Sequence, residues 1–206
     1  MKDLPADDSA LLMILAGPAG SGKTTLCERI VAENDRIERV VTSTTRPPRE
    51  GEEHGVDYYF FSNDEFERKI EEGSFLEWAK VHANRYGTLK SVIKDKLSER
   101  IDLVMNIDVQ GVASLREAAS GYPAIGDRLV TVFIMPSDFD ELRRRLRGRG
   151  QDDSEEIERR IRSAEREVEA WSAFDYVVRS KSKDEDYDAI RSIWQAEKRR
   201  ASRLKG

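Results

Sequence analysis

The glycine-rich segment at residues 17–24, GPAGSGKT, constrains the fold more than any other part of the chain. An apolar run at 11–16 precedes it, and a helix-forming run at 25–33 follows it. A strand, a glycine-rich turn and a helix in this order form the setting in which the pattern G-x-x-x-x-G-K-[ST] holds phosphate. The glycines let backbone N–H groups converge on an anion, and the helix N-terminus adds positive potential. The segment therefore predicts a nucleotide phosphate site.

Two side chains of this segment carry specific chemistry. Lys23 can reach the β- and γ-phosphates of a triphosphate, and the Thr24 hydroxyl can bind Mg²⁺. The Gly20-x-Gly22 spacing also occurs in dinucleotide-binding turns, but the GKT ending favours a triphosphate. A flexible turn with a solvated lysine is the alternative, which the ordered pattern and its flanks disfavour. The residues assigned to ATP here are Gly17, Pro18, Ala19, Gly20, Ser21, Gly22, Lys23, Thr24 and Thr25.

The composition is that of a globular protein. The 206 residues are 36% charged and 38% hydrophobic, which suits one α/β domain with inserts. A net charge of −5 disfavours general binding to nucleic acid or to acidic membranes. The single cysteine, Cys27, excludes an intrachain disulfide and fits a reducing compartment. No apolar stretch is long enough for a membrane span, and the polar, acidic residues 1–9 are unlike a signal peptide, so we expect a cytoplasmic location.

Periodicity predicts the remaining elements. Strands are expected at 40–44, 58–61, 75–81, 101–109, 129–135 and 176–178. In the strand 101–109, Asn106 and Asp108 would share one face. Helices are expected at 62–72, 91–100, between Gly111 and Gly121, after Ser137 as a cap, after the polar break at 148–153, and at the C-terminal end of the chain.

Three of these helices carry further signals. Ser62 and Glu65 form a capping box. The helix after the polar break places an apolar stripe on one face, and the last helix does the same. The two stripes are Ile157, Ile161, Ala164 and Val168, and Tyr187, Ile190, Ile193 and Trp194.

Strands and helices alternate at both ends of the chain, with a strand-rich stretch between them. This order predicts an α/β fold in which helices flank a central parallel sheet that a small β-rich insertion interrupts. The nucleotide would lie at the carboxyl ends of the strands. We expect a single domain over residues 1–206.

A second anion site is indicated in the insertion. Arg46 and Arg49 lie three residues apart in a loop rich in Pro and Gly, beside the hydroxyls of Thr42, Ser43, Thr44 and Thr45. Guanidinium groups grip phosphate oxygens in a bidentate manner, so the pair could clamp a phosphomonoester. Two solvated loop arginines remain an equal alternative on this evidence alone.

Together, the segments resemble the guanylate kinase family. The matching segments are 17–24, 43–52, 55–58, 75–79, 86–88, 107–111 and 146–150. They follow the family order from about residue 10 to residue 178, which is most of the chain. Apart from the phosphate loop each match is weak alone, but the ordered set is specific.

The resemblance implies a role for each matching residue. The GMP-binding residues would be Arg46, Arg49, Tyr58 and Tyr86 at the phosphate, and Thr42, Glu77, Thr88 and Asp108 at the guanine. Guanine offers an O6 acceptor and an N2 donor, so hydroxyls and carboxylates suit it, while AMP would leave polar groups unpaired. Glu77 as a surface carboxylate, and the two tyrosines as ordinary aromatics, are the alternatives. The resemblance assigns Arg145, Arg149 and Arg160 to ATP and makes Lys23, Arg46, Arg149 and Arg160 catalytic.

The implied fold is the P-loop nucleoside-monophosphate-kinase fold with a helical lid. The core would comprise residues 10–41, 91–136 and 171–203, the GMP-binding insertion 42–90, and the lid 137–170. The implied activity is ATP:GMP phosphotransfer giving GDP and ADP, with dGMP also an acceptor, ATP as donor and Mg²⁺ as cofactor. The partners would be these small substrates, with neither nucleic acid nor membrane, for a monomer or a homodimer.

The chain departs from the family pattern at three places. Thr42 stands where serine is common, which keeps the hydroxyl. Asn106 stands where an acid is common, so Mg²⁺ would bind Thr24, phosphates and water, with Asn106 assisting through water. Residues 179–181 lack the usual Asn–Asp pair, so no contact with adenine is assigned there.

Two rival functions differ in class. One is a non-catalytic protein-binding module like those of membrane-associated scaffolds, which the intact phosphate loop disfavours. The other is a kinase for a different small acceptor, such as AMP or a sugar.

Overall fold

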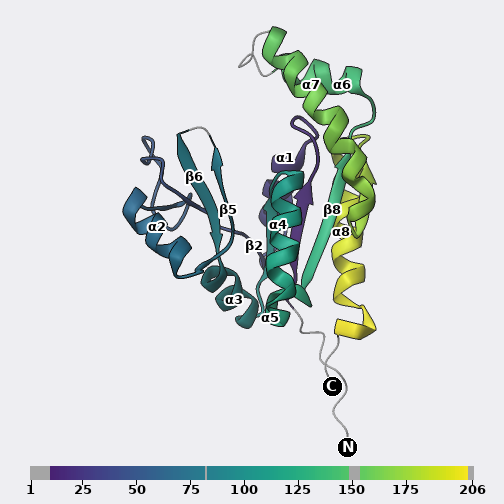
Figure 1. The fold of residues 1–206 in the computed structure, drawn as a ribbon. Coiled ribbons are helices and arrows are strands. Elements are labelled where there is room, and N and C mark those ends of the chain that lie inside the picture. Colours follow the sequence, from purple (N-terminus) through teal and green to yellow (C-terminus); the bar gives the residue numbers. More distant parts are fainter. Residues whose placement is uncertain (1–9, 82, 149–153, 204–206) are drawn as a thin grey trace, which may run out of the picture.

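A five-stranded parallel sheet forms the centre of the computed structural model, which describes residues 10–81, 83–148 and 154–203 (Figure 1). The strands follow the order β2-β7-β1-β8-β9. Their bounds are β1 (Leu12–Ala16), β2 (Ile37–Arg39), β7 (Asp102–Asn106), β8 (Leu129–Met135) and β9 (Tyr176–Arg179). Every residue of β1 is buried, as expected for a central parallel strand covered on both faces.

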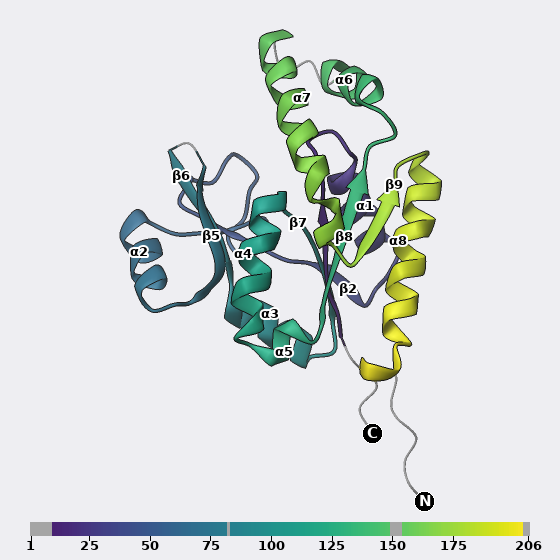
Figure 2. The ribbon, with the colours of Figure 1, turned by 45° about the vertical axis from the view of Figure 1, so that its right-hand side comes forward.

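Helices cover both faces of this sheet (Figure 2). Helices α1 (Lys23–Ala32) and α8 (Lys183–Lys198) pack on one face, and α3 (Lys90–Ser98), α4 (Val109–Ser120) and α5 (Pro123–Gly126) pack on the other. Alternate side chains of β1 enter the two cores, since Leu12 and Ile14 join one apolar cluster while Met13 and Leu15 join the other. The α/β architecture predicted from the order of elements is confirmed.

The insertion carries a second sheet with the strand order β4-β3-β6-β5. It comprises β3 (Ser43–Thr44), β4 (Tyr59–Phe60), β5 (Phe75–Val81) and β6 (Asn84–Leu89), with helix α2 (Asn63–Glu71) against it. The predicted capping box is confirmed, because the Ser62 hydroxyl accepts from the Glu65 N–H and the Glu65 carboxylate accepts from the Ser62 N–H. Phe66 stacks on Phe75 at 4.4 Å between ring centroids and anchors α2 to the sheet.

The lid consists of helices α6 (Phe139–Gly148) and α7 (Ser154–Val168). Leu142 and Leu146 of α6 pack against the apolar stripe of α7, in which Ile157, Ile161 and Ala164 are buried as predicted. Ala19 of the glycine-rich loop packs against the same cluster, so the lid core touches the loop. The short helices η1 (Glu169–Ala173) and η2 (Ala201–Arg203) follow later in the chain.

The prediction of one strand at 40–44 is wrong. The chain leaves the parallel sheet after Val40, whose N–H donates to the Val104 carbonyl, and enters the second sheet at Ser43. Strands β2 and β3 therefore belong to different sheets. The sequence does not indicate where one sheet ends and the other begins, because β-branched residues lie on both sides of the boundary. Strand β6 and helix α5 were not predicted as elements.

Two predicted helix starts are also wrong. Strand β7 ends at Asn106, and Asp108 is the N-cap of α4, with its carboxylate accepting from the Gly111 N–H at 2.6 Å. Asn106 and Asp108 thus do not share one strand face. Helix α6 is capped by Asp138, which accepts from the Glu141 N–H at 2.6 Å, and not by Ser137.

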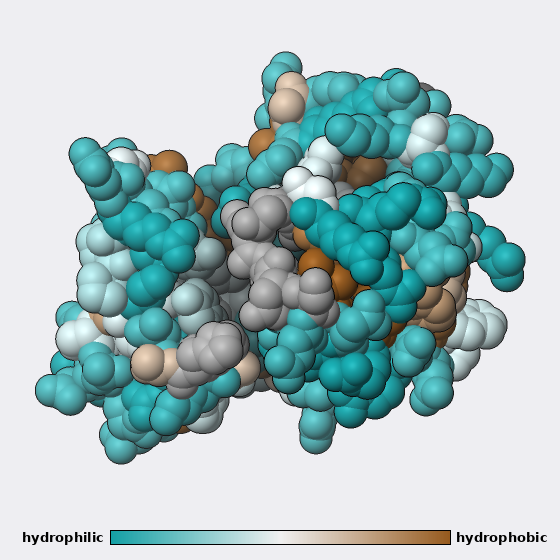
Figure 3. Space-filling model, turned by 90° about the horizontal axis from the view of Figure 1, so that it is seen from above, coloured by the Kyte–Doolittle hydropathy of each residue, from teal (hydrophilic) through white to brown (hydrophobic). Residues whose placement is uncertain are grey.

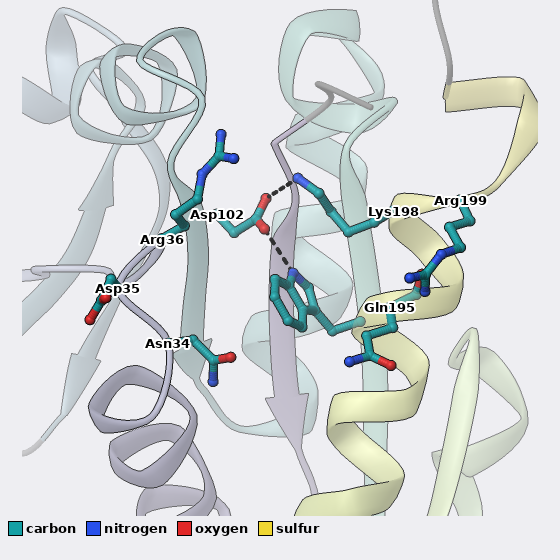
Figure 4. A pocket seen from close by; sticks show the side chains of 8 residues that line it. Asn34, Asp35, Arg36, Asp102, Gln195, Lys198 and Arg199 are labelled. Carbon is teal, nitrogen blue, oxygen red and sulfur yellow. Dashed lines mark hydrogen bonds and ion pairs between the residues drawn. The ribbon is translucent and has the colours of Figure 1, made fainter. Parts of the chain in front are cut away.

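A buried carboxylate joins the elements at the amino ends of the strands. Asp102 accepts from the Trp194 indole at 2.7 Å and from the Lys198 ammonium at 3.1 Å (Figure 4). It also accepts from the Leu11 N–H at 2.7 Å. It lines a cavity of about 410 Å³ between β7 and α8. The carboxylate therefore ties α8 to β1 and β7, at the end of the sheet opposite the glycine-rich loop.

The end of α8 and the following helix η2 are docked on the core. Glu197 is 2% exposed and accepts from the Tyr176 hydroxyl and from Arg203. Arg203 also donates to the Leu129 carbonyl at 3.2 Å. Among the helices described, none has the length and apolar character that crossing a membrane requires.

The predicted core, insertion and lid boundaries stay predictions. The second sheet lies within 42–90, and both lid helices lie within 137–170.

Candidate active site

The glycine-rich loop lies at the carboxyl end of β1 and runs into α1. Gly17, Gly20 and Gly22 have φ values of 137°, 87° and 93°, which residues with a Cβ rarely adopt. A Cβ on Gly17 would lie 2.5 Å from the Ile134 carbonyl oxygen, so only glycine lets the loop approach β8 this closely. The glycines of the G-x-x-x-x-G-K-[ST] pattern are therefore required by the backbone conformation of the loop.

Lys23 begins α1 and folds back over the loop. Its ammonium group donates to the Gly17 carbonyl at 2.6 Å and to the Pro18 carbonyl at 2.8 Å. The Ser21 side chain is buried, and the backbone N–H of Ser21 donates to the Pro18 carbonyl at 3.2 Å, which closes the turn. A partly buried ammonium group at the start of a helix, beside a glycine-rich turn, is suited to hold phosphate oxygens.

Thr24 and Asn106 lie together beside the loop. The Asn106 amide donates to the Thr24 hydroxyl at 3.5 Å, and half a turn of that amide would present its oxygen instead. Mg²⁺ takes one or two protein oxygens and completes its shell with water and phosphate, so the pair suits it. No cluster of three or more His, Cys, Asp or Glu side chains suited to a metal occurs in residues 10–81, 83–148 or 154–203.

The lid arginines assigned to ATP pair with carboxylates of their own helices. Arg145 donates to Glu141 at 2.9 Å, and Arg160 donates to Glu156 at 3.1 Å. Arg149 lies outside the described residues. Contact of these arginines with ATP therefore stays a prediction.

Arg143, a lid arginine that was given no role from the sequence, bridges the two lid helices through Glu158 at 2.8 Å.

Arg46 stands in an aromatic and acidic setting in the insertion. Its guanidinium carbon lies 5.5 Å from the centroid of the Tyr58 ring, and the Tyr58 and Tyr86 rings are 6.2 Å apart. Thr44 pairs with Tyr86 across β3 and β6. Three of the four residues predicted to bind the GMP phosphate are thus brought together.

Arg49, the fourth residue, has an exposed side chain, and its N–H donates to Glu52 at 2.7 Å.

Glu77 and Thr88 pair across β5 and β6. The Thr88 hydroxyl donates to the Glu77 carboxylate at 2.6 Å. Burial raises the pKa of the Glu77 carboxyl, the hydrogen bond from Thr88 opposes this, and the negative charge of Asp108 raises it further. Asp108 therefore lies close enough to act electrostatically on Glu77, although it belongs to the core and not to the insertion. Thr42 is half-buried between the two sheets, and its carbonyl accepts from the Tyr59 N–H.

Sequence reasoning gave no role to two further carboxylates near these residues. Glu52 binds the Arg46 side chain and the Arg49 backbone, and its signal in the sequence was its place in the matching segment 43–52, three residues after Arg49. Glu167 of α7 lines a cavity of about 430 Å³ together with Asp108 and Gln110. Burial raises the pKa of Glu167, and its charge interacts with those of Lys23 and Asp108. No local pattern could have singled out Glu167, because its helix only meets α4 in the folded chain.

The insertion packs on the core through β5 and α4, and the lid rises over the glycine-rich loop (Figure 1). Hydrophilic side chains predominate on the upper surfaces of both the insertion and the lid (Figure 3). A phosphate loop on a parallel sheet, combined with an inserted sheet that carries a second polar site and a helical lid, defines a P-loop kinase of the nucleoside-monophosphate-kinase type.

Comparison with known proteins identifies the family. The sequence model described as guanylate kinase matches residues 9–197. A guanylate kinase from Geobacter sulfurreducens is 40% identical over 194 residues, covering 94% of this chain and 92% of the relative. One from Hydrogenovibrio crunogenus is 43% identical over 185 residues, covering 90% and 87%. The crystal structure of guanylate kinase from Anaplasma phagocytophilum superposes with a TM-score of 0.72 at 28% identity, covering 98% and 93%. The chain belongs to the guanylate kinase family and is an enzyme of the kinase class, as its motifs predicted.

Proposed function

We propose that this enzyme transfers the γ-phosphoryl group of ATP to GMP, giving ADP and GDP. The observation that carries the proposal is the hydrogen-bonded pair of half-buried Glu77 and buried Thr88, whose carboxylate also feels the negative charge of Asp108. Carboxylates accept from the N1–H and N2 amino groups of guanine, and the Thr88 hydroxyl can turn its single proton from Glu77 to O6. Adenine presents the opposite pattern at its six-position, so AMP would leave buried groups of this site unpaired. Acceptance of dGMP follows from the same base contacts.

The attacking group is a phosphate oxygen of GMP, which is already anionic near neutral pH, so the reaction needs no general base. Catalysis then consists of alignment and charge stabilisation. In this proposal Lys23 holds the transferring group, and Arg46 and Arg49 orient the acceptor phosphate and reduce the repulsion between two anions. Arg145, Arg149 and Arg160 would approach ATP when the lid closes, which also excludes water.

Magnesium is part of the proposal through the side chains that fit it. Thr24 would bind the ion, with Asn106 assisting through water, and the ion would supply charge neutralisation at the β- and γ-phosphates. The amide of Asn106 keeps an oxygen for this role but lacks the negative charge of a carboxylate. Both side chains would also orient the water molecules around the ion.

A substrate panel tests the proposed function. ADP release is measured with ATP and, in turn, GMP, dGMP, AMP, CMP and UMP as acceptors. We expect turnover with GMP and dGMP, and at least about a hundredfold lower kcat/KM with AMP. Equal activity with AMP would remove the guanine assignment of Glu77 and Asp108. Absence of turnover with every acceptor would favour a binding module.

The raised pKa of Glu77 predicts how GMP binding depends on pH. The carboxylate accepts from guanine only when ionised, and burial makes it protonate at a higher pH than an exposed glutamate. As the pH falls through this raised pKa, the KM for GMP should therefore rise, approaching about tenfold per pH unit. The KM is measured from about pH 8 down to about pH 5.

The variant Glu77→Gln provides the control for this prediction. The phosphate of GMP itself titrates with a pKa of about 6, and this titration persists in the variant. The difference between the two pH profiles therefore isolates Glu77. We expect the variant to bind GMP more weakly at pH 8 and to lose the additional acidic rise. Parallel profiles would exclude Glu77 as the titrating group.

A further inference from the structure

The carboxylate of Glu52 binds both arginine residues of the proposed acceptor-phosphate site, Arg46 through its side chain and Arg49 through its backbone. Glu52 Oε1 accepts from the Arg46 guanidinium at 2.8 Å, and its Oε2 accepts from the Arg49 backbone N–H at 2.7 Å. The two partners of the ion pair are largely covered, with side chains 15% and 19% exposed. Hydrogen bonding by the Arg49 N–H lowers the pKa of the Glu52 carboxyl, and Arg46 lowers it further, so the carboxylate stays ionised.

The Arg46 side chain is fixed on more than one side. Its Nη1 donates to the Pro47 carbonyl at 2.7 Å, and its guanidinium carbon lies 5.8 Å from the Phe60 ring centroid as well as over Tyr58. The bonds to Pro47 and Glu52 use two of the five N–H groups of the guanidinium. The side chain can therefore be held in one orientation while it still presents donors to a ligand.

We propose that Glu52 is a positioning residue, which sets the Arg46 guanidinium and the backbone at Arg49 in place before an acceptor phosphate binds. This inference rests on the proposed function, since it concerns the phosphate of GMP. A long, flexible arginine loses conformational freedom when it binds a ligand, and fixing it beforehand reduces that cost. Fixing it also keeps the acceptor phosphate aligned with the transferring group, and small misplacements there lower kcat strongly.

Charge alone would act in the opposite direction. A carboxylate beside a phosphate dianion repels it, so removing the negative charge of Glu52 should strengthen GMP binding if electrostatics dominated. Loss of positioning should weaken both GMP binding and turnover. The two effects have opposite signs in one variant, which makes the inference testable.

The test compares Glu52→Gln with Glu53→Gln. Both variants remove one negative charge from the same loop, but the Glu53 side chain is exposed and is not part of the bridge. Steady-state kinetics are measured with GMP varied at saturating ATP, and then with ATP varied at saturating GMP. We expect Glu52→Gln to lower kcat/KM for GMP by at least about tenfold, with the KM for ATP within about twofold of the wild type. Glu53→Gln should stay within about twofold on every parameter.

Three outcomes overturn the inference. Glu52→Gln could equal the wild type, could bind GMP more tightly, or could raise the KM for ATP as much as that for GMP, which would indicate general damage to the fold. Glu52→Asp gives a second check, because its shorter carboxylate can restore one of the two bonds and should recover part of the activity. If the wild type does not phosphorylate GMP at all, the proposed function fails, and this inference falls with it.

Discussion

Lys23→Ala is expected to lower kcat by about 10³-fold while leaving the fold intact. In the proposed reaction the ammonium group faces the phosphates, where negative charge shifts during transfer. The ammonium group donates to the loop carbonyls of Gly17 and Pro18, and water can satisfy these carbonyls once the side chain is gone. The measurement is kcat at saturating ATP and GMP, together with the melting temperature.

Lys94→Ala is the matched control for this prediction. Lys94 lies on α3 with an exposed side chain, so its loss changes the net charge equally without touching the loop. It should leave kcat unchanged. Normal turnover in Lys23→Ala would remove the assignment of the phosphate loop, and a large fall in its melting temperature would show that Lys23 acts on stability instead.

Asp102→Ala is expected to lower the free energy of unfolding by about 3–5 kcal/mol. The side chain of Asp102 is 4% exposed and pairs with Lys198, so its removal takes away the counter-charge of a partly buried ammonium group. The Leu11 N–H and the Trp194 indole lose their acceptor as well, and a buried donor without a partner costs about 1–3 kcal/mol. The measurement is equilibrium unfolding in urea, followed by the tryptophan fluorescence.

Asp35→Ala provides the comparison for Asp102. Asp35 lines the same cavity with an exposed side chain, so the variant makes the same charge change without removing a buried bond (Figure 4). It should alter the free energy of unfolding by less than about 0.5 kcal/mol. Equal destabilisation by the two variants would mean that local charge, and not the buried bonds of Asp102, stabilises the contact between α8 and the sheet.

Much of the fold could be predicted because its signals are local. The apolar run of β1, the capping box at Ser62 and the stripe on α7 each reflect the period of one element. The strand predicted at 40–44 failed because the residues on both sides are β-branched, while the change from one sheet to the other depends on hydrogen bonds to Val104 and Tyr59. A pattern within five residues holds no information about such distant partners.

The residues of the candidate site also fall into those that local sequence patterns could predict and those that they could not. The phosphate loop could be predicted because the glycines and Lys23 act through the backbone geometry of eight consecutive residues. Glu77 and Thr88 could be named by family resemblance, but their 2.6 Å hydrogen bond depends on the register of β5 with β6. Glu52 and Glu167 received no role, because a carboxylate in a loop or on a helix gives no sign of the partner it will meet.

By itself, the sequence determined the class of fold, the position of the phosphate loop and the family of the enzyme. Those properties depend on short segments, in which the backbone geometry of a single element or turn requires particular residues at particular spacings. Only the tertiary structure decided that Asp108 acts on Glu77 from the core, that Glu52 joins two arginine positions, and that Asp102 anchors the last helix. The reason is physical: burial and charge at these sites arise from segments far apart in the chain, which only folding brings within a few ångströms.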